Sequence, residues 1–317
     1  MLRAALRAGL GFPYECNSGS CGTCRFEVRS GAFAMAWPDA PALSERDRRR
    51  GRLLGCQATP AQDATIAVRL DNAYAPPVTP MRAPAHLAAI RPLTHDMSEF
   101  EFHRRAGARF LPGQYALLSL PGVEGSRAYS MSNLSNVEGA WRFVVKRKPD
   151  GAGSRALFDR LVTGDTVMLD GPFGLAYLRD GGRRAIVCIA GGSGLSPMLS
   201  IVRGAMSRPP AACTAVHLFY GARRPEDAFA LASLANFGPD SSDVDFKLAL
   251  SAANDLSAGA WPGLRGLIHD VVEREAAGLL AEAEVYFAGP PAMTRATHEM
   301  LIRRQVPPER IHFDSFY

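Results

Sequence analysis

Four cysteines are the residues of this chain whose type and spacing most directly suggest chemistry. Cys16, Cys21 and Cys24 follow the pattern C-x4-C-x2-C, and Cys56 follows after 31 intervening residues. Four thiolates at this spacing are the ligand set of a 2Fe-2S cluster. The residues between the first three are small, so the backbone can approach the cluster closely and its glycines can adopt positive φ angles. The sequence therefore predicts a 2Fe-2S cluster held by these four cysteines.

Two other interpretations of the cysteines compete with the cluster. They could be structural cysteines at chance spacing, or they could bind zinc. A zinc site usually pairs its ligands as two short C-x2-C units, whereas the fourth cysteine here stands alone. The lone fourth cysteine favours the cluster, and the loop resembles that of plant-type ferredoxins, which have a β-grasp α+β fold.

Three further motifs contain the residue types that bind flavins and dinucleotides. Residues 127–130 read Arg-Ala-Tyr-Ser, and residues 151–154, Gly-Ala-Gly-Ser, open a helix predicted over 155–161. Residues 191–197, Gly-Gly-Ser-Gly-Leu-Ser-Pro, follow an apolar strand and precede a helical run. Strand, glycine turn and helix form the context of a dinucleotide-binding loop, although a plain strand-to-helix turn has the same order.

At these motifs the chain resembles the ferredoxin–NADP+ reductase superfamily, whose R-x-Y-S motif binds FAD. The resemblance implies that Arg127 pairs with the pyrophosphate through its guanidinium fork, that Tyr129 stacks on the flavin ring, and that Ser130 bonds near flavin N5. Amides at Gly153 and Ser154 would bind the phosphates at a helix N-terminus. The other implied FAD contacts are Ala128, Val144, Val145 and Lys146.

The same resemblance places NADH beside the second glycine loop. NADPH stays possible, because Arg223 and Arg224 could hold a 2′-phosphate or simply lie on the surface. Ala288 stands where many members have a cysteine beside the nicotinamide. The resemblance implies that Phe316 covers the flavin with Asp314 nearby, so the candidate catalytic residues are Tyr129, Ser130, Asp314 and Phe316. The implied coenzyme-binding residues are Gly191, Gly192, Ser193, Gly194, Pro197, Gly221, Arg223, Gly289 and Pro290.

The elements that must position these residues follow from hydrophobic periodicity. Residues 1–74 place the cysteines after a helix with Leu2, Ala5, Leu6 and Leu10 on one face, followed by strands at 26–29 and 65–70. The polar stretch 44–52 is a helix or a loop, and residues 75–84 form a proline-rich linker. Residues 85–178 predict a small antiparallel barrel, with strands at 87–90, 100–103, 115–120, 141–146 and 166–169. Residues 179–317 predict a doubly wound α/β domain with strands at 185–190, 215–220, 245–250 and 284–288.

Composition limits the classes of function. The net charge of +5 could favour an acidic protein partner, but no basic block of the nucleic-acid-binding kind appears. No apolar run is long enough for a transmembrane helix. Cys188 and Cys213 lie in apolar runs and predict buried free thiols, which together with a cluster indicate the cytoplasm. His217 is expected to be a satisfied or surface histidine, and Trp37 either packs or offers a docking surface near the cluster.

Over its full length the chain resembles the reductase components of bacterial multicomponent oxygenases, most of all those of toluene and xylene monooxygenases. That resemblance implies transfer of electrons from NADH through FAD and the cluster to an oxygenase hydroxylase or its Rieske ferredoxin, in aromatic hydrocarbon oxidation. Such ferredoxin domains begin with a β-hairpin, whereas this chain begins in the helix. The alternatives are therefore a cluster-free flavin, ferric or dye reductase and a non-enzymatic redox-sensing module.

Overall fold

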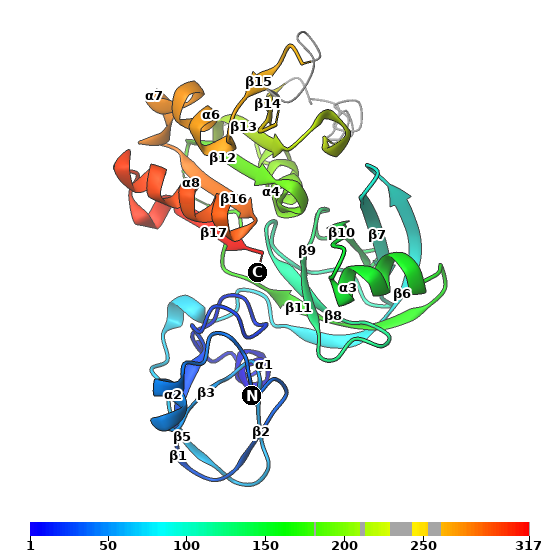
Figure 1. Ribbon diagram of the computed structural model, residues 1–317, viewed down its shortest axis with the longest axis vertical. Coiled ribbons are helices and arrows are strands. Elements are labelled where there is room, and N and C mark those ends of the chain that lie inside the picture. The colour runs from blue at the N-terminus through cyan, green and yellow to red at the C-terminus, as the bar shows by residue number, and fades with distance from the viewer. Residues whose placement is uncertain (181, 210–212, 229–242, 253–260, 317) are drawn as a thin grey trace.

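The computed structural model describes residues 1–180, 182–209, 213–228, 243–252 and 261–316. Three bodies follow one another along the chain (Figure 1): an N-terminal body of small sheets, an antiparallel sheet of six strands, and a parallel sheet covered by helices. The C-terminal end of the chain lies where the three bodies meet. The multidomain architecture predicted from the sequence is confirmed.

The N-terminal body is a three-stranded antiparallel sheet in the order β3-β1-β5, with a separate β2-β4 pair. Leu2 and Leu6 are fully buried, as the helical pattern predicts. Leu10 is 46% exposed, which corrects the prediction, because α1 ends at Arg7 and Gly9 turns the chain with φ 76°. The elements are α1 (Leu2–Arg7), β1 (Arg25–Ser30), β2 (Phe33–Met35), α2 (Glu45–Arg49), β3 (Arg52–Leu54), β4 (Ala58–Pro60), β5 (Thr65–Ala67) and a 3-10 turn (Asn72–Tyr74).

The second body is an antiparallel sheet in the order β10-β7-β6-β11-β8-β9 around an aromatic core. Its first strand begins at Met81 and pairs with β11 from there, so it starts inside the stretch 75–84 that the sequence suggested as a linker. The sequence also missed β9, which carries the Arg-Ala-Tyr-Ser motif. The elements are β6 (Met81–Pro92), β7 (Met97–His103), β8 (Tyr115–Ser119), β9 (Arg127–Ser130), β10 (Ala140–Lys146), α3 (Ala152–Arg155), a π-helical turn (Ala156–Arg160) and β11 (Thr166–Phe173).

The third body is a parallel sheet in the order β15-β14-β13-β12-β16-β17. Alternate residues of β12 face opposite layers: Ile186 and Cys188 pack in the cluster that contains α4, and Val187 and Ile189 in the cluster that contains α6 and α8. Burial on both faces explains the continuous apolar run of this strand. The bounds are β12 (Arg184–Gly191), a 3-10 turn (Gly192–Gly194), α4 (Leu195–Met206), β13 (Cys213–Ala222), a 3-10 turn (Pro225–Asp227), β14 (Val244–Leu250), β15 (Leu264–Arg265), α6 (Ile268–Glu275), α7 (Ala277–Leu280), β16 (Glu284–Gly289), α8 (Pro291–Arg303), a 3-10 turn (Pro308–Arg310) and β17 (Ile311–Ser315).

The N-terminal body packs directly against the barrel. The Tyr115 hydroxyl donates to the Glu15 carbonyl at 2.7 Å, and the Gly174 N–H donates to the Tyr14 hydroxyl oxygen at 3.1 Å. Arg7 forms an ion pair with the buried Asp170 at 2.5 Å. These contacts hold the cysteine loop against the edge of the barrel. Among the described helices, none is both long enough and apolar enough to cross a membrane.

Candidate functional site

The structure gathers the four cysteines from their distant sequence positions into two thiol pairs. The Cys21 thiol hydrogen-bonds to Cys16, and the Cys24 thiol to Cys56. Together with the Ser18 hydroxyl and the backbone N–H groups of Ser18 and Cys21, which lie 3.4 and 3.3 Å from Cys16 Sγ, the first bond lowers the pKa of Cys16 to about 4. In each pair the donor thiol, Cys21 or Cys24, has a raised pKa, and the acceptor, Cys16 or Cys56, has a lowered pKa, so one thiol of each pair is favoured as the thiolate that a metal binds.

The pairwise arrangement distinguishes between the two metal interpretations. A tetrahedral zinc site would bring all four sulfurs to within about 4 Å of one another, because each Zn–S bond is about 2.3 Å long. In the part of the chain that the structure describes, the only group of three or more potential ligands within 4.8 Å does not include a cysteine. Two separate pairs instead match a cluster with two irons, each bound by two cysteines.

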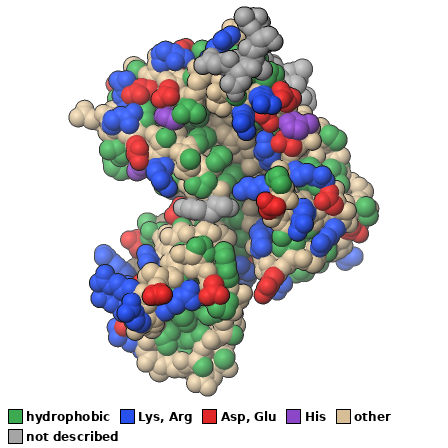
Figure 2. Space-filling view, viewed as in Figure 1, with side chains coloured by type: hydrophobic (Ala, Val, Ile, Leu, Met, Phe, Trp, Pro, Cys, Tyr) green, Lys and Arg blue, Asp and Glu red, His purple; other side chains and the backbone are tan. Residues whose placement is uncertain are grey.

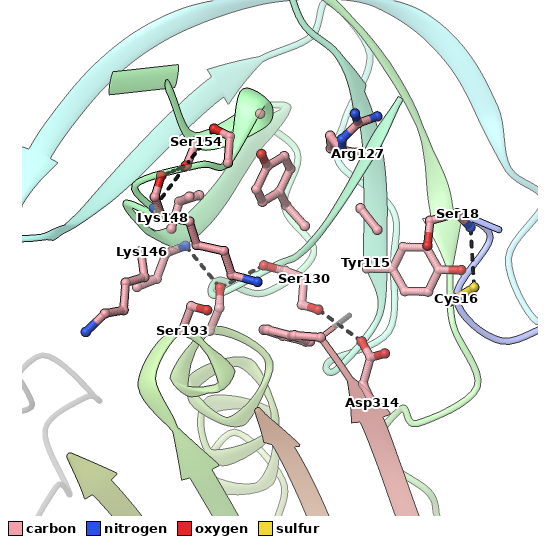
Figure 3. Close-up of a pocket in the computed structure, with 18 of the residues that line it drawn as sticks. Cys16, Ser18, Tyr115, Arg127, Ser130, Lys146, Lys148, Ser154, Ser193 and Asp314 are labelled. Carbon is pink, nitrogen blue, oxygen red and sulfur yellow. Dashed lines mark hydrogen bonds between the residues drawn. The ribbon is translucent and has the colours of Figure 1, made fainter. Parts of the chain in front are cut away.

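A cavity of about 360 Å3 lies where the three bodies meet (Figure 3). Cys16 and Tyr115 lie at one end, and Lys146 and Ser193 lie at the other, with Ser130 and Asp314 between them. Thirteen of the site residues predicted from the sequence line it: Cys16, Arg127, Ala128, Tyr129, Ser130, Val144, Val145, Lys146, Gly153, Ser154, Ser193, Asp314 and Phe316. The structure also places there Ser18, Tyr115, Lys148, Gly151, Ala152, Ser196 and Ser315.

One wall of the cavity is the turn around Gly153 and Ser154. The Ser154 hydroxyl accepts from the Lys148 N–H at 3.0 Å and so fixes the loop. A Cβ on Gly153 would lie 2.7 Å from the Tyr129 hydroxyl oxygen, so only glycine allows this approach. The helix begins at Ala152 and becomes π-helical after Arg155, which corrects the helix predicted over 155–161.

The Ser130 hydroxyl donates to Asp314 Oδ2 at 3.3 Å and connects β9 to the last strand. Burial, reinforced by the negative charge of Glu15, raises the pKa of Asp314 to about 7. Asp314 therefore retains a proton over much of the neutral range. The sequence indicated no β-strand here, yet β17 pairs in parallel with β16 and fixes the position of this carboxyl group.

The glycines of the dinucleotide motif lie outside the residues that line the cavity, at the carboxyl ends of neighbouring strands. Gly191 is the register partner of Gly221. A Cβ on Gly194 would lie 2.0 Å from the Ala288 carbonyl oxygen, so the turn packs against β16 without room for a side chain. Parallel α/β sheets bind nucleotides at this edge. Gly192, Pro197, Gly289, Pro290 and Arg223 flank the same edge without lining the cavity.

The comparisons with known proteins agree with this geometry. Three family models match in order: a 2Fe-2S iron-sulfur cluster binding domain over residues 1–61, an oxidoreductase FAD-binding domain over 84–177, and an oxidoreductase NAD-binding domain over 188–299. Ferredoxin–NAD(P)(+) reductase CarAd of Metapseudomonas resinovorans is 41% identical, and the alignment covers 100% of this chain and 94% of that one. The chain belongs to the ferredoxin–NAD(P)+ reductase family.

Other relatives of this reductase belong to different oxygenase systems. The ferredoxin–NAD(+) reductase component of the alkene monooxygenase system of Xanthobacter autotrophicus is 40% identical, over 100% of this chain and 95% of that one. The xylene/toluene monooxygenase electron transfer component XylA of Pseudomonas putida is 31% identical, over 100% and 88%. The solved structure of the ferredoxin reductase in carbazole 1,9a-dioxygenase matches with a TM-score of 0.92 and 38% identity, covering 100% and 92%.

The reductase also has an ionic contact between its FAD-binding and NAD-binding domains that the sequence did not indicate. Lys146, expected near the adenosine of FAD, lines the cavity, but its ammonium lies 2.8 Å from Asp96 and 3.4 Å from Asp227. The His95 ring nitrogen Nδ1 lies 3.1 Å from the Glu226 carbonyl oxygen. Asp96 and Asp227 come from different domains, so Lys146 joins them across the cleft.

Helix α4 of the reductase carries a polar stripe that docks it on the barrel. The Ser196 hydroxyl donates to the Ser130 carbonyl at 2.7 Å, Ser200 donates to the Asn133 carbonyl at 2.7 Å, and Arg203 donates to the Ser132 carbonyl. The spacing of these residues, at i, i+4 and i+7, places them on one face of the helix. This spacing was the signal in the sequence that could have found them.

The remaining predictions from the sequence have mixed outcomes. Cys188 is a buried free thiol as expected, whereas Cys213 is only half-buried because it begins the strand β13. His217 lies 2.9 Å from Asp245, as expected of a satisfied histidine. Trp37 is 43% exposed, so it does not simply pack.

Proposed function

We propose that this reductase passes electrons from NADH, through FAD and a 2Fe-2S cluster, to an oxygenase hydroxylase or its Rieske ferredoxin in the oxidation of aromatic hydrocarbons, in the cytoplasm. One observation carries the proposal: a single cavity is lined by the Arg-Ala-Tyr-Ser motif, by Cys16 of the cysteine loop and by Ser193 of the dinucleotide turn. Electron transfer between three cofactors requires such a meeting point. Several relatives are named as the reductase or electron transfer component of an oxygenase system.

The cysteines fit the cluster as two pairs. Cys16 and Cys21 would hold one iron, and Cys24 and Cys56 the other. When bound, the flavin accepts the two electrons of a hydride and the cluster carries electrons singly. Cys16 and Ser18 of the loop line the cavity, so Cys16 is the cluster ligand that would face the flavin site.

Neighbouring residues of the proposed flavin site would have different roles. Arg127 Nη1 donates to the carbonyls of Glu124 and Ser126 at 2.9 and 3.3 Å, which orients its guanidinium at the mouth of the cavity for the pyrophosphate. Tyr129 and Phe316 would enclose the flavin ring and exclude water. Gly153 and Ser154 would present backbone amides to the phosphates. Ala128, Val144 and Val145 form the apolar wall, and Lys146 lines the cavity while its ammonium pairs with Asp96 and Asp227.

The Ser130–Asp314 pair supplies a proton position inside the cavity. Because the pKa of Asp314 is raised to about 7, its carboxyl group can hold a proton within reach of Ser130 Oγ at neutral pH. Ala288, which stands where many members have a cysteine beside the nicotinamide, offers no thiol there. The exchangeable proton proposed for this cavity lies at Ser130 Oγ and Asp314.

The coenzyme would bind at the glycine edge of the parallel sheet. Gly191, Gly192, Ser193, Gly194 and Pro197 would approach its pyrophosphate, with Gly221 at the ribose and Gly289 and Pro290 beside the nicotinamide. Arg223 is exposed after β13, where it could meet a 2′-phosphate. NADH is the proposed donor, and the ratio of NADH to NADPH turnover measures what Arg223 contributes.

An anaerobic absorbance spectrum with NADH titration tests the proposal, using Cys56→Ser against Cys213→Ser as a matched control. The wild type and Cys213→Ser should both show flavin bands near about 450 nm and a broader iron–sulfur shoulder, and NADH should bleach both. Cys56→Ser should lose the shoulder and the reduction of protein acceptors, but keep NADH–ferricyanide turnover.

The alternatives predict different spectra. A wild-type protein that shows only flavin, and still bleaches, would be the cluster-free reductase. Bleaching without steady turnover with any acceptor would indicate a redox-sensing module. Either result would overturn the proposed electron path.

A further inference from the structure

The N-terminal domain carries a concentration of arginines on the side that faces away from the barrel. Residues 44–52 contain five arginines and two acids, for a net charge of +3. Lys and Arg side chains gather over α2, at the left edge of this domain (Figure 2). We call Arg25, Arg46, Arg48, Arg49, Arg50 and Arg52 the arginine patch.

The acids of this segment do little to offset the exposed positive charge. Asp47 is buried beneath the patch and forms ion pairs with Arg25 at 3.1 Å and Arg52 at 3.2 Å. The Ser44 hydroxyl, together with these two guanidinium groups, holds the pKa of Asp47 well below its usual range. Asp47 is therefore charged and offsets part of the charge of Arg25 and Arg52, so the positive charge open to a partner lies on the other arginines of the patch.

Three of the arginines have no partner of their own. The guanidinium groups of Arg46, Arg49 and Arg50 are exposed and form no ion pair or hydrogen bond with any described residue. Glu45 is the one exposed acid within the segment. Unpaired arginines at the surface contribute little to folding stability, but they attract an acidic surface over long range.

Trp37 connects the arginine patch to the cysteine loop. Its side chain is 43% exposed, and a Cβ on Gly19 of the loop would lie 3.1 Å from its Cε3 atom. The same Cβ would lie 3.3 Å from Gln57 Nε2, which is itself 3.5 Å from Cys56 Sγ. Arg48 donates to the Pro38 carbonyl at 2.7 Å, which ties α2 to the Trp37 segment.

The cysteine loop therefore has two different sides. Cys16 faces the cavity, whereas the Cys56 side leads through Gln57 to the exposed indole and then to the arginines. An electron that arrives from the cavity side has a route outward only where a partner can approach the loop. The surface of Trp37, next to the Cys56 side of the loop and to the arginine patch, is such a place.

We propose that Trp37 and the arginine patch form the docking surface for an electron-accepting protein with an acidic face. This inference rests on the proposed function, because it assumes that a cluster delivers electrons at this loop. Charge complementarity would steer the encounter, and the indole would supply the apolar anchor at its centre. A membrane is disfavoured, because α2 is five residues long and has no apolar face left to bury in lipid.

Two triple variants with the same change in net charge test the proposal. The test variant is Arg46→Glu/Arg49→Glu/Arg50→Glu. The control is Arg105→Glu/Arg109→Glu/Arg183→Glu, at three exposed positions in the other domains where the structure gives the side chains no partner among the described residues. The probes are the acidic haem protein cytochrome b5 and the basic haem protein cytochrome c. Each ferric haem takes one electron from the reduced protein and becomes ferrous, and no proton is transferred.

Binding is measured by calorimetry with oxidised proteins, so it does not depend on turnover, and NADH-driven haem reduction is followed separately. At low salt the test variant should bind and reduce cytochrome b5 at least about tenfold more weakly than wild type. Its reduction of cytochrome c should be unchanged or faster. At about 0.5 M salt wild type and variant should converge, because screening removes the steering. The control, the absorbance of the cluster and NADH–ferricyanide turnover should stay at wild-type values.

The outcomes separate this inference from the proposed function. If wild type reduces both haem proteins and the test variant behaves like the control, the docking surface is wrong and the electron path stands. If wild type binds cytochrome b5 through the patch but reduces neither haem protein, the surface stands and the electron path fails. A third outcome would assign the patch to lipid and overturn the proposal. In that case wild type and the control variant bind anionic vesicles, only the test variant loses this binding, and binding of cytochrome b5 is the same in all three proteins.

Discussion

The two sides of the N-terminal domain are built on different physical principles. The side toward the barrel uses buried contacts of fixed geometry: the Tyr115 hydroxyl on the Glu15 carbonyl, the Tyr14 hydroxyl oxygen on the Gly174 N–H, and one ion pair, Arg7–Asp170. The opposite side presents exposed arginines and Trp37, with few internal partners. Buried, directional bonds fix a distance, whereas exposed charges act at long range and are screened by salt.

This difference suits an electron carrier with one permanent and one exchangeable neighbour. On the proposed path, electrons enter from a cavity that belongs to the same chain, so the inner contacts can be permanent. They leave to a separate protein, which has to bind and dissociate in each cycle. Fast association through charge, without a large buried interface, serves that exchange. Perturbing each side should therefore change different measured quantities.

The largest expected effect comes from the buried carboxyl group of the cavity. The pKa of Asp314 is raised to about 7, while an unfolded aspartate titrates near about 4. Between these values the folded protein holds a proton that the unfolded chain has lost. The stabilisation is therefore complete below the unfolded pKa and is lost as pH rises through about 7. The melting temperature of the wild type should therefore decrease as pH rises through this window, whereas that of Asp314→Asn should stay level.

An exposed aspartate provides the control for that measurement. Asp63→Asn, in the N-terminal domain, should keep the wild-type profile, because its carboxyl group is in water. If the melting temperatures of Asp314→Asn and wild type changed with pH in the same way, the cavity would not disfavour the charged form of the Asp314 carboxyl group. The contrast between a dry inner side and a wet outer side would then be lost.

A smaller effect is expected at the ion pair between the N-terminal domain and the barrel. The Asp170 side chain is 5% exposed, and its Oδ2 atom has no hydrogen-bond partner among the described residues. Arg7→Ala would leave this carboxylate uncompensated and should lower the free energy of unfolding by about 2 kcal/mol, since the arginine itself is partly exposed. Urea denaturation followed by flavin fluorescence measures the change.

Two variants make that result specific to the inner side. Arg69→Ala removes an exposed arginine of the same domain and should have almost no effect on unfolding. Arg7→Ala/Asp170→Asn should recover part of the loss, because no buried charge remains unpaired. Neither variant should alter cytochrome b5 binding, and a change there would mean that the two sides are not independent.

The sequence predicted the features whose signals are local. The cysteine triplet and the glycine turn each lie within a few residues, so their spacing and context indicated them, and the Arg-Ala-Tyr-Ser motif was indicated by its resemblance to the reductase superfamily. It missed β9 and β17 because these short strands have no pattern of their own and exist through pairing with β8 and β16. Tyr115 and Ser196 were missed for the same reason: they reach the cavity only when domains distant in sequence pack together.

The predicted ends of helices and strands were wrong where a single backbone feature outweighed the hydrophobic periodicity. Gly9 ends the first helix before Leu10 can join its buried face, although the apolar spacing continues. Met81 already pairs in the barrel sheet although prolines surround it. The periodicity of the arginine-rich segment 44–52 does not decide between a helix and a loop, and the helix Glu45–Arg49 is capped by one side-chain pair, Ser44 with Asp47.

That N-cap gives the smallest predicted effect and the sharpest link between the two sides. The Ser44 hydroxyl accepts from the Asp47 N–H at 3.2 Å, and Asp47 Oδ2 accepts from the Ser44 backbone N–H at 3.4 Å, which together form a capping box. Ser44→Ala should lower the free energy of unfolding by about 1 kcal/mol. Urea denaturation monitored by cluster absorbance checks this, with Ser30→Ala on the exposed end of β1 as the control. Because Arg46, Arg49 and Arg50 keep their charges, cytochrome b5 binding should change by no more than about twofold. A loss of binding as large as that of the triple arginine variant would mean that the partner recognises the shape of α2, and not only its charge.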